Sequence, residues 1–209
     1  MALWENTFYL VLLCLTVACT NNLVKNPGAE TIPLTNEWTI ASGRWTQRKK
    51  APLPQEEKAY FFPGVAAHAE LFQDIDISGY GLFTDLGMMK VDFSSYMRVF
   101  PQRPADKSYE VIEFRNADSV VIDSFATGHY DSTNAWVNIT HARPLPKATR
   151  IVRVRLISDR YNGSNNDGYH DDISLALSLA WWLYVIAAVI AVAVLRLLFK
   201  IKFRRSSTH

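Results

Sequence analysis

Cysteine is nearly absent from this chain of 209 residues, and both cysteines, Cys14 and Cys19, lie within the first twenty residues. If those residues are removed, no cysteine remains, so no disulfide framework holds the rest together. A domain of about 150 residues can bury a sufficient core without disulfides. Cysteine usage therefore gives no information about the redox compartment.

The sequence also lacks the short motifs that carry familiar chemistry. It contains no Gly-x-Ser-x-Gly nucleophile elbow, no His-Glu-x-x-His zinc motif, no P-loop and no dinucleotide glycine motif. The adjacent acids Asp171 and Asp172 make a poor acid–base pair, because neighbours on a strand point to opposite faces. We expect the scattered histidines to be surface residues without a role; they are His68, His129, His141 and His170. These absences favour a protein that binds and is not an enzyme.

The chain also lacks a strong excess of either charge. Its net formal charge is +2, and acidic and basic residues are mixed along most of its length. This gives no argument for nucleic-acid binding. The basic excess lies after Leu195, where the chain has no acid. The basic residues there are Arg196, Lys200, Lys202, Arg204 and Arg205.

Long apolar runs occur only at the two ends. The first, Phe8 to Ala18, is shorter than the roughly 20 residues that a spanning helix needs. It is followed by small residues, which predicts a secretory signal peptide over residues 1–20. The preceding segment has Glu5 and no Lys or Arg, so a buried N-terminal strand stays open as an alternative.

The second run has no charge from Ile173 to Leu195 and is long enough to span a bilayer. Trp181, Trp182 and Tyr184 are typical of a membrane interface, and the basic tail indicates a cytoplasmic C-terminus. The sequence therefore predicts a transmembrane helix over residues 178–199 and a basic tail over 200–209. The N-terminal domain would be extracellular or lumenal. A buried helix of a soluble protein is the alternative.

Between these runs the pattern is that of β-strands. Apolar and polar residues alternate over residues 69–78, 89–100 and 150–158, as in strands with one wet face. Shorter apolar runs and turn clusters bring the expected number of strands to nine or ten. The sequence thus predicts an all-β sandwich over residues 21–177.

The order of several short segments resembles the galactose-binding-like jelly rolls, the fold of many carbohydrate-binding modules. "NLVKNPGAE" (22–30) is followed by Trp38 and Trp45, then by "AELFQDIDIS" (69–78) and a closing "NNDGYHDDISL" (165–175). The resemblance covers residues 22–177, and no single motif in it is specific. It implies a jelly roll and says little about function.

The resemblance also implies a structural calcium ion where the first and last strands meet. Its ligands would be Glu30, a backbone carbonyl near Gly28, and Asp172. Two carboxylates and carbonyl groups suit calcium, which prefers hard oxygen ligands. The alternative is that Glu30 is a turn acid and Asp172 caps a strand.

The best candidate ligand surface is the polar side of the strand expected over residues 89–100. Sugar sites combine an aromatic platform with polar groups, and this side carries Lys90, Asp92, Ser94, Tyr96 and Arg98. We therefore predict a membrane-anchored module that recognises carbohydrate or a glycoprotein. A structural or adhesion subunit packed against another membrane protein is the alternative.

Two sequons agree with an extracellular or lumenal domain. They are "NIT" at Asn138 and "NGS" at Asn162. Sequons also occur by chance, so they support this topology without establishing it.

Overall fold

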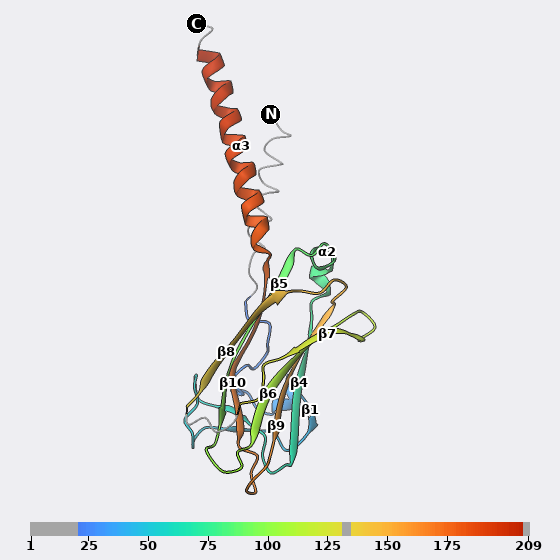
Figure 1. The fold of residues 1–209 in the computed structure, drawn as a ribbon, viewed down its shortest axis with the longest axis vertical. Coiled ribbons are helices and arrows are strands. Elements are labelled where there is room, and N and C mark those ends of the chain that lie inside the picture. The colour runs from blue at the N-terminus through green and yellow to red at the C-terminus, as the bar shows by residue number, and fades with distance from the viewer. Residues whose placement is uncertain (1–20, 131–134, 207–209) are drawn as a thin grey trace.

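The computed structural model describes residues 21–130 and 135–206, which form a β-sandwich followed by a helix (Figure 1). Two antiparallel five-stranded sheets make up the sandwich. Sheet A contains, in spatial order, β2 (Thr46–Arg48), β3 (Tyr60–Phe62), β10 (Gly168–Leu179), β5 (Met89–Val99) and β8 (Val137–Pro144). Sheet B contains β1 (Thr39–Ser42), β4 (His68–Asp76), β9 (Ile151–Asp159), β6 (Lys107–Arg115) and β7 (Val121–Ala126). The predicted sandwich is confirmed, whereas the predicted signal peptide lies outside the described residues.

Short helices connect some strands, and one long helix follows the last strand. They are η1 (Leu34–Asn36), η2 (Ser78–Tyr80), α2 (Gly81–Asp85) and α3 (Trp181–Ser206).

The core lies between the two sheets because the long strands alternate in polarity. Along β5, every second side chain from Met89 to Val99 is buried, and those between are half-exposed. The side chains of β4 and β9 alternate in the same way, as the sequence predicts. Each strand therefore has one face toward the core and one outer face.

A buried glutamine joins the N-terminal segment to sheet B. Gln73 lies on the inner side of β4 and is 6% exposed. Its amide donates to the carbonyls of Lys25 and Glu37 at 3.0 Å each, and its carbonyl accepts from Lys25 N at 2.8 Å. Trp38 Nε1 also donates to Lys25 O at 3.0 Å. These bonds fix the loop that precedes β1 and satisfy its buried polar groups.

The C-terminal segment differs from the sequence prediction. Residues 178 and 179 do not begin a helix but pair with Lys90 and Met89 of β5, so the last strand runs two residues beyond the predicted domain end. The helix begins at Trp181 and points away from the sandwich (Figure 1). Within the residues that the structure describes, no helix is both long and apolar enough to cross a membrane. The transmembrane helix predicted over residues 178–199 is therefore not supported.

Candidate functional site

The outer face of sheet A brings together side chains from all five of its strands. Residues directly opposite each other in an antiparallel pair project on the same face. Arg48 pairs with Tyr60, Asp171 with Tyr96, and Tyr96 in turn with Asn138. Tyr169 pairs with Arg98 in the next row of this face. The predicted ligand strip of β5 therefore lies beside a group of aromatic residues that the sequence did not place there.

Four aromatic rings form a cluster on this face, separate from the main core. Tyr60 and Tyr169 have ring centroids 5.2 Å apart, and Trp136 meets Tyr60 edge-on at 5.5 Å. Phe62 completes the cluster, with its ring 6.0 Å from Tyr169 and the guanidinium of Arg48 3.8 Å above it. Burial raises the pKa of Tyr60 to about 12, so its hydroxyl stays protonated and able to donate.

The loop of residues 49–59, between β2 and β3, covers one end of the cluster. Tyr60 Oη donates to Lys50 O at 3.2 Å, and Trp136 Nε1 donates to Leu53 O at 2.9 Å. Trp136 stays half-exposed, whereas Tyr60 is fully buried. The loop therefore holds the Trp136 ring in one orientation, at the edge of the solvent-accessible part of the outer face, which is formed by β5 and β8.

The residues predicted to bind ligand lie on this solvent-accessible part but are not equivalent. Lys90 Nζ contacts Asp92 Oδ1 at 2.8 Å, and Ser178 Oγ donates to Asp92 Oδ2 at 2.6 Å. These two charges therefore largely satisfy each other. Arg98 makes no ion pair within the described part of the chain, and Tyr96 beside it is half-exposed. Tyr96 and Arg98 are the members of the strip that remain available to a ligand.

A group of oxygens meets at Gly28, where the sequence predicts calcium. A Cβ atom at Gly28 would lie 3.2 Å from Asp171 Oδ1, 3.6 Å from Glu30 Oε1 and 3.8 Å from Ala59 O. The absence of a side chain at Gly28 thus leaves a small cradle lined by two carboxylates and a carbonyl. Asp171, and not the neighbouring Asp172 that the resemblance implies, is the acid nearest to Gly28 in the structure. Asp172 lies in a bulge of β10, where it and Ile173 together stand opposite Ser95 of β5, and it has a φ of 46°.

Both carboxylates of the cradle already accept backbone hydrogen bonds. Glu30 Oε1 accepts from Lys58 N at 3.0 Å and from Ala59 N at 2.7 Å. Asp171 Oδ2 accepts from Gln55 N at 2.8 Å, and its Oδ1 accepts from Asp172 N at 2.9 Å. Burial nevertheless raises the pKa of Asp171 from 3.8 to about 7. A cation beside Asp171 would offset this cost of burying a negative charge.

The oxygens around Gly28 are two carboxylates and a carbonyl, the hard donors that calcium prefers. The described residues contain no cluster of three or more His, Cys, Asp and Glu side chains that could hold a metal. An ion here would need carbonyl or water oxygens to complete its coordination, which calcium accepts readily. The backbone around the cradle is also strained, because Asn26, Ala29, Glu57 and Asp172 all have positive φ. Such strain persists only where the surroundings enforce it.

Sequence reasoning missed a buried polar tetrad that links the two sheets. His170 lies between Glu110 and Ser108, with Nδ1 3.0 Å from Glu110 Oε1 and Nε2 2.8 Å from Ser108 Oγ. Ser95 Oγ donates to Glu110 Oε2 at 2.5 Å, and none of the four residues is exposed to solvent. The expectation that His170 lies on the surface is therefore wrong. The available signal was the alternation of β6, which places Ser108 and Glu110 on the same side as buried Ile112 and Phe114.

This tetrad has the residue types of a serine hydrolase triad, but a substrate cannot reach it. All four side chains are inside the sandwich, and a Cβ on Gly168 would lie only 3.2 Å from Ser108 Oγ. Catalysis requires a reacting atom about 3 Å from the nucleophile, and the backbone of β10 fills that space. The tetrad is therefore a structural link between β6 of sheet B and β5 and β10 of sheet A.

The comparisons with known proteins identify the fold. No family model matches the sequence, and no curated protein is significantly similar to it. Among solved structures, the enzymatically active domain of bacteriophage CBA120 tailspike protein 4 matches with a TM-score of 0.56 and 14% identity, over 76% of this chain and 21% of that one. A family 16 carbohydrate-binding module matches with a TM-score of 0.51 and 16% identity, over 74% of this chain and 99% of the module. An arabinose-bound α-L-arabinofuranosidase matches with a TM-score of 0.50 and 12% identity, over 80% of this chain and 29% of the enzyme.

The chain has the β-sandwich fold of carbohydrate-binding modules. It spans about a fifth of the tailspike chain and under a third of the arabinofuranosidase, but nearly the whole module. Similarity at this level of identity concerns the fold and does not identify a ligand.

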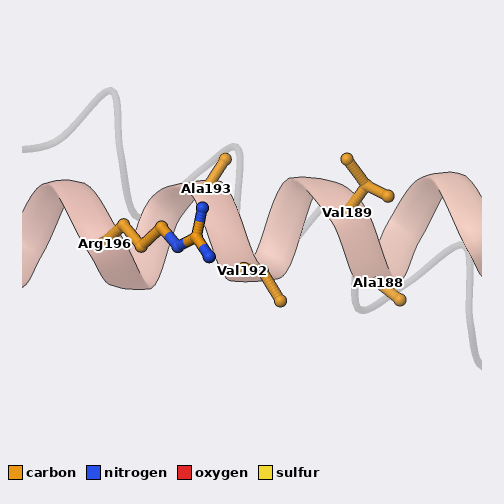
Figure 2. Close-up of a pocket in the computed structure, with 5 residues that line it drawn as sticks. All are labelled: Ala188, Val189, Val192, Ala193 and Arg196. Atoms are coloured by element: carbon orange, nitrogen blue, oxygen red, sulfur yellow. The ribbon is translucent and has the colours of Figure 1, made fainter.

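Outside the sandwich, a shallow hollow lies on the surface of α3 (Figure 2). Its lining residues are Ala188, Val189, Val192, Ala193 and Arg196. All five belong to the helix, and four are small or medium apolar side chains. Among the described residues that line it there is one charged group and no aromatic ring, and these residues alone do not make a sugar site.

Proposed function

We propose that this domain binds carbohydrate, free or on a glycoprotein, through the outer face of sheet A. The observation that carries the proposal is the placement of Tyr96, Arg98 and Trp136 together on that face. The apolar face of a pyranose ring stacks on an aromatic ring, and its hydroxyls need hydrogen-bond partners at the edge. Tyr96 and Trp136 supply the rings, and Arg98 supplies five N–H donors.

The site is largely pre-formed, which favours binding. Trp136 is held by its bond to Leu53 O and by its contact with Tyr60, and Tyr96 lies on a central strand of the sheet. A ligand therefore orders few side chains when it binds. The fold of the matching family 16 module is consistent with this role.

Glycan-array binding of the folded protein tests the proposal. Tyr96→Ala should weaken binding at least about tenfold, because it removes one stacking surface from the face. Tyr161→Ala is the matched control, since Tyr161 is 54% exposed in a loop outside sheet A. Equal loss in both variants, or no binding of any glycan by the parent protein made without N-glycosylation, would contradict the proposal.

We also propose that calcium occupies the Gly28 cradle as a structural ion, with Glu30 and Asp171 as its carboxylate ligands. Such an ion would hold the N-terminal loop, the loop of residues 49–59 and β10 together. Because the same loop anchors Trp136, calcium would support the sugar-binding face without touching the ligand.

A protein partner is the second candidate, and one feature of sheet B favours it. Val120, Val121 and Ile122 are exposed in succession at the start of β7, an edge strand. An apolar edge strand can pair with another chain. Co-purification of a stoichiometric partner in mild detergent, lost in Val121→Lys, would favour this function over sugar binding.

Membrane attachment is a proposal from the sequence alone. The uncharged run that ends at Leu195 and the basic residues after it are typical of an anchor with a cytoplasmic tail. The domain would then be extracellular or lumenal, a location that suits a glycan ligand. Release of the full chain from membranes by alkaline carbonate would contradict this proposal.

A further inference from the structure

The two sequons lie in different structural settings. Asn138 and Thr140 are exposed on β8, and Ile139 between them is buried in the core. Because strand side chains alternate, the buried Ile139 fixes Asn138 and Thr140 on the outer face of sheet A. Asn162 lies in an exposed loop between β9 and β10, and its amide donates to Arg103 O at 3.1 Å.

Asn138 is a direct neighbour of the proposed sugar site. It pairs across the strands with Tyr96, and Thr140 pairs with Ser94. Directly opposed residues have Cβ atoms about 5 Å apart. Trp136 lies two residues before Asn138 in the same segment, next to the start of β8. An adduct on Asn138 therefore begins directly beside both aromatic residues that the proposed function assigns to the ligand, opposite Tyr96 and two residues from Trp136.

We propose that an N-linked glycan on Asn138 covers this face and switches carbohydrate binding off. The inference rests on the proposed function, and it makes Asn138 a regulatory modification site. In the modification, Asn138 Nδ2 attacks the anomeric carbon of an oligosaccharide carried on a lipid pyrophosphate. The new C–N bond forms, the C–O bond to the pyrophosphate breaks, and the amide loses one proton. The lipid pyrophosphate leaves with the bonding electrons.

The position of the first sugar explains the masking. This sugar is bonded to the Asn138 amide, so it cannot move away from Tyr96 by more than the length of one short side chain. Its pyranose ring has an apolar face of the same kind as the proposed ligand, and stacking on Tyr96 would place it in the site. A glycan on Asn162 starts from a loop outside sheet A and has no such relation to Tyr96.

The test compares four forms of the full chain made in cells that glycosylate proteins. They are the parent, Asn138→Gln, Thr140→Ala and Asn162→Gln, with occupancy of each sequon read from peptide mass spectra. The two changes at the first sequon remove the glycan in different ways, and Asn162→Gln is the matched control. We expect glycan-array binding to rise at least about tenfold in Asn138→Gln and Thr140→Ala and to stay unchanged in Asn162→Gln. Equal binding by the parent and both first-sequon variants would overturn the proposal, as would an unoccupied Asn138 beside an occupied Asn162.

A second measurement works without a ligand. Ser94→Cys places a thiol on the outer face, opposite Thr140, and its labelling by a bulky maleimide reports access to that face. The parent chain, with Cys14 and Cys19, gives the background. Labelling should be slowed at least about tenfold by the Asn138 glycan, and the added change Asn138→Gln should restore it. If no form binds any glycan, the proposed function fails, and the labelling rates alone decide the masking: equal rates would overturn it.

Discussion

The outer faces of the two sheets follow the same alternating pattern but use their polar groups differently. On sheet B, Arg155 contacts Glu70 through two hydrogen bonds of 2.8 Å and Glu113 through a third. Arg153 beside it forms two bonds of 2.7 Å with Asp74. These charges are paired within the face, which leaves little for a ligand to gain.

On sheet A the pairing is incomplete. Lys90 and Asp92 pair with each other, but Arg98 has no carboxylate partner among the described residues, and Tyr96 and Trp136 present partly exposed rings. Half-exposed aromatic rings next to unpaired donors are typical of binding surfaces. The contrast agrees with the proposal that sheet A uses its outer face for recognition, whereas the outer face of sheet B is held by its own ion pairs.

The two faces also respond to pH in opposite directions. On sheet B, burial of Glu113 is outweighed by Arg115 and Arg155, which hold its pKa below the usual 4.5. Its stabilising contribution is present above that value and is lost as the pH falls. On sheet A, burial raises the pKa of Asp171 to about 7. The folded state therefore favours the protonated acid, and stability falls as the pH rises from about 4 through 7.

The largest effect on stability is expected inside the sandwich, where the buried tetrad links sheet A to sheet B. Glu110→Ala removes the partner of Ser95 Oγ and of His170 Nδ1 and leaves these two atoms without a hydrogen bond inside the sandwich, while His170 Nε2 keeps Ser108 Oγ. The free energy of unfolding should fall by about 4 kcal/mol, measured by urea denaturation. Glu110→Gln keeps a similar shape and should cost less. A loss of under about 1 kcal/mol in the alanine variant would show that the tetrad does not hold the sheets together.

The second effect concerns the pH response of the sheet A side. Without calcium, the free energy of unfolding should fall by about 3 kcal/mol between about pH 5 and about pH 8 because Asp171 must ionise while buried. Saturating calcium should restore most of this loss by binding the ionised form. Asp171→Asn cannot ionise, so its stability should respond less to pH and should not respond to calcium.

Two outcomes of this measurement would change the interpretation. If calcium stabilises the parent and Asp171→Asn equally, the ion binds elsewhere. If the parent and Asp171→Asn have the same pH dependence in chelator, a different group titrates. Asp172→Asn is the matched control, because it alters the neighbouring carboxyl that the sequence favoured as the ligand.

The sequence predicted the sandwich well because its long strands follow simple rules. The alternation over β4, β5 and β9 depends only on which side chains can be buried, and the structure confirms it. Gln73 is a polar residue on the inner side of β4 and so departs from the alternation. The backbone carbonyls of Lys25 and Glu37 accept the hydrogen bonds of its side-chain amide. The end of β10 was placed two residues too early, because an apolar run looks alike in a strand and in a helix.

The site was predicted less completely because it depends on contacts between distant segments. The bulge in β10 determines that Asp171, and not Asp172, faces Gly28, and alternation alone cannot reveal a bulge. The loop of residues 49–59 determines that Trp136 is fixed at the edge of the ligand face. The strip around Tyr96 was found because it lies within one strand, where spacing alone defines a face.

The smallest effects give the sharpest comparison of the two outer faces. Arg155→Ala leaves Glu70 and Glu113 partly buried without their shared partner, so the free energy of unfolding should fall by about 1 kcal/mol while glycan binding is unchanged. Arg98→Ala removes a side chain without an ion pair among the described residues, so stability should change by under about 0.5 kcal/mol while glycan binding falls about tenfold. Denaturation and array binding of the two variants check both expectations. If the effects are reversed, so that Arg98 matters for stability and Arg155 for binding, then sheet B carries the ligand face and Arg98 on sheet A has a structural purpose.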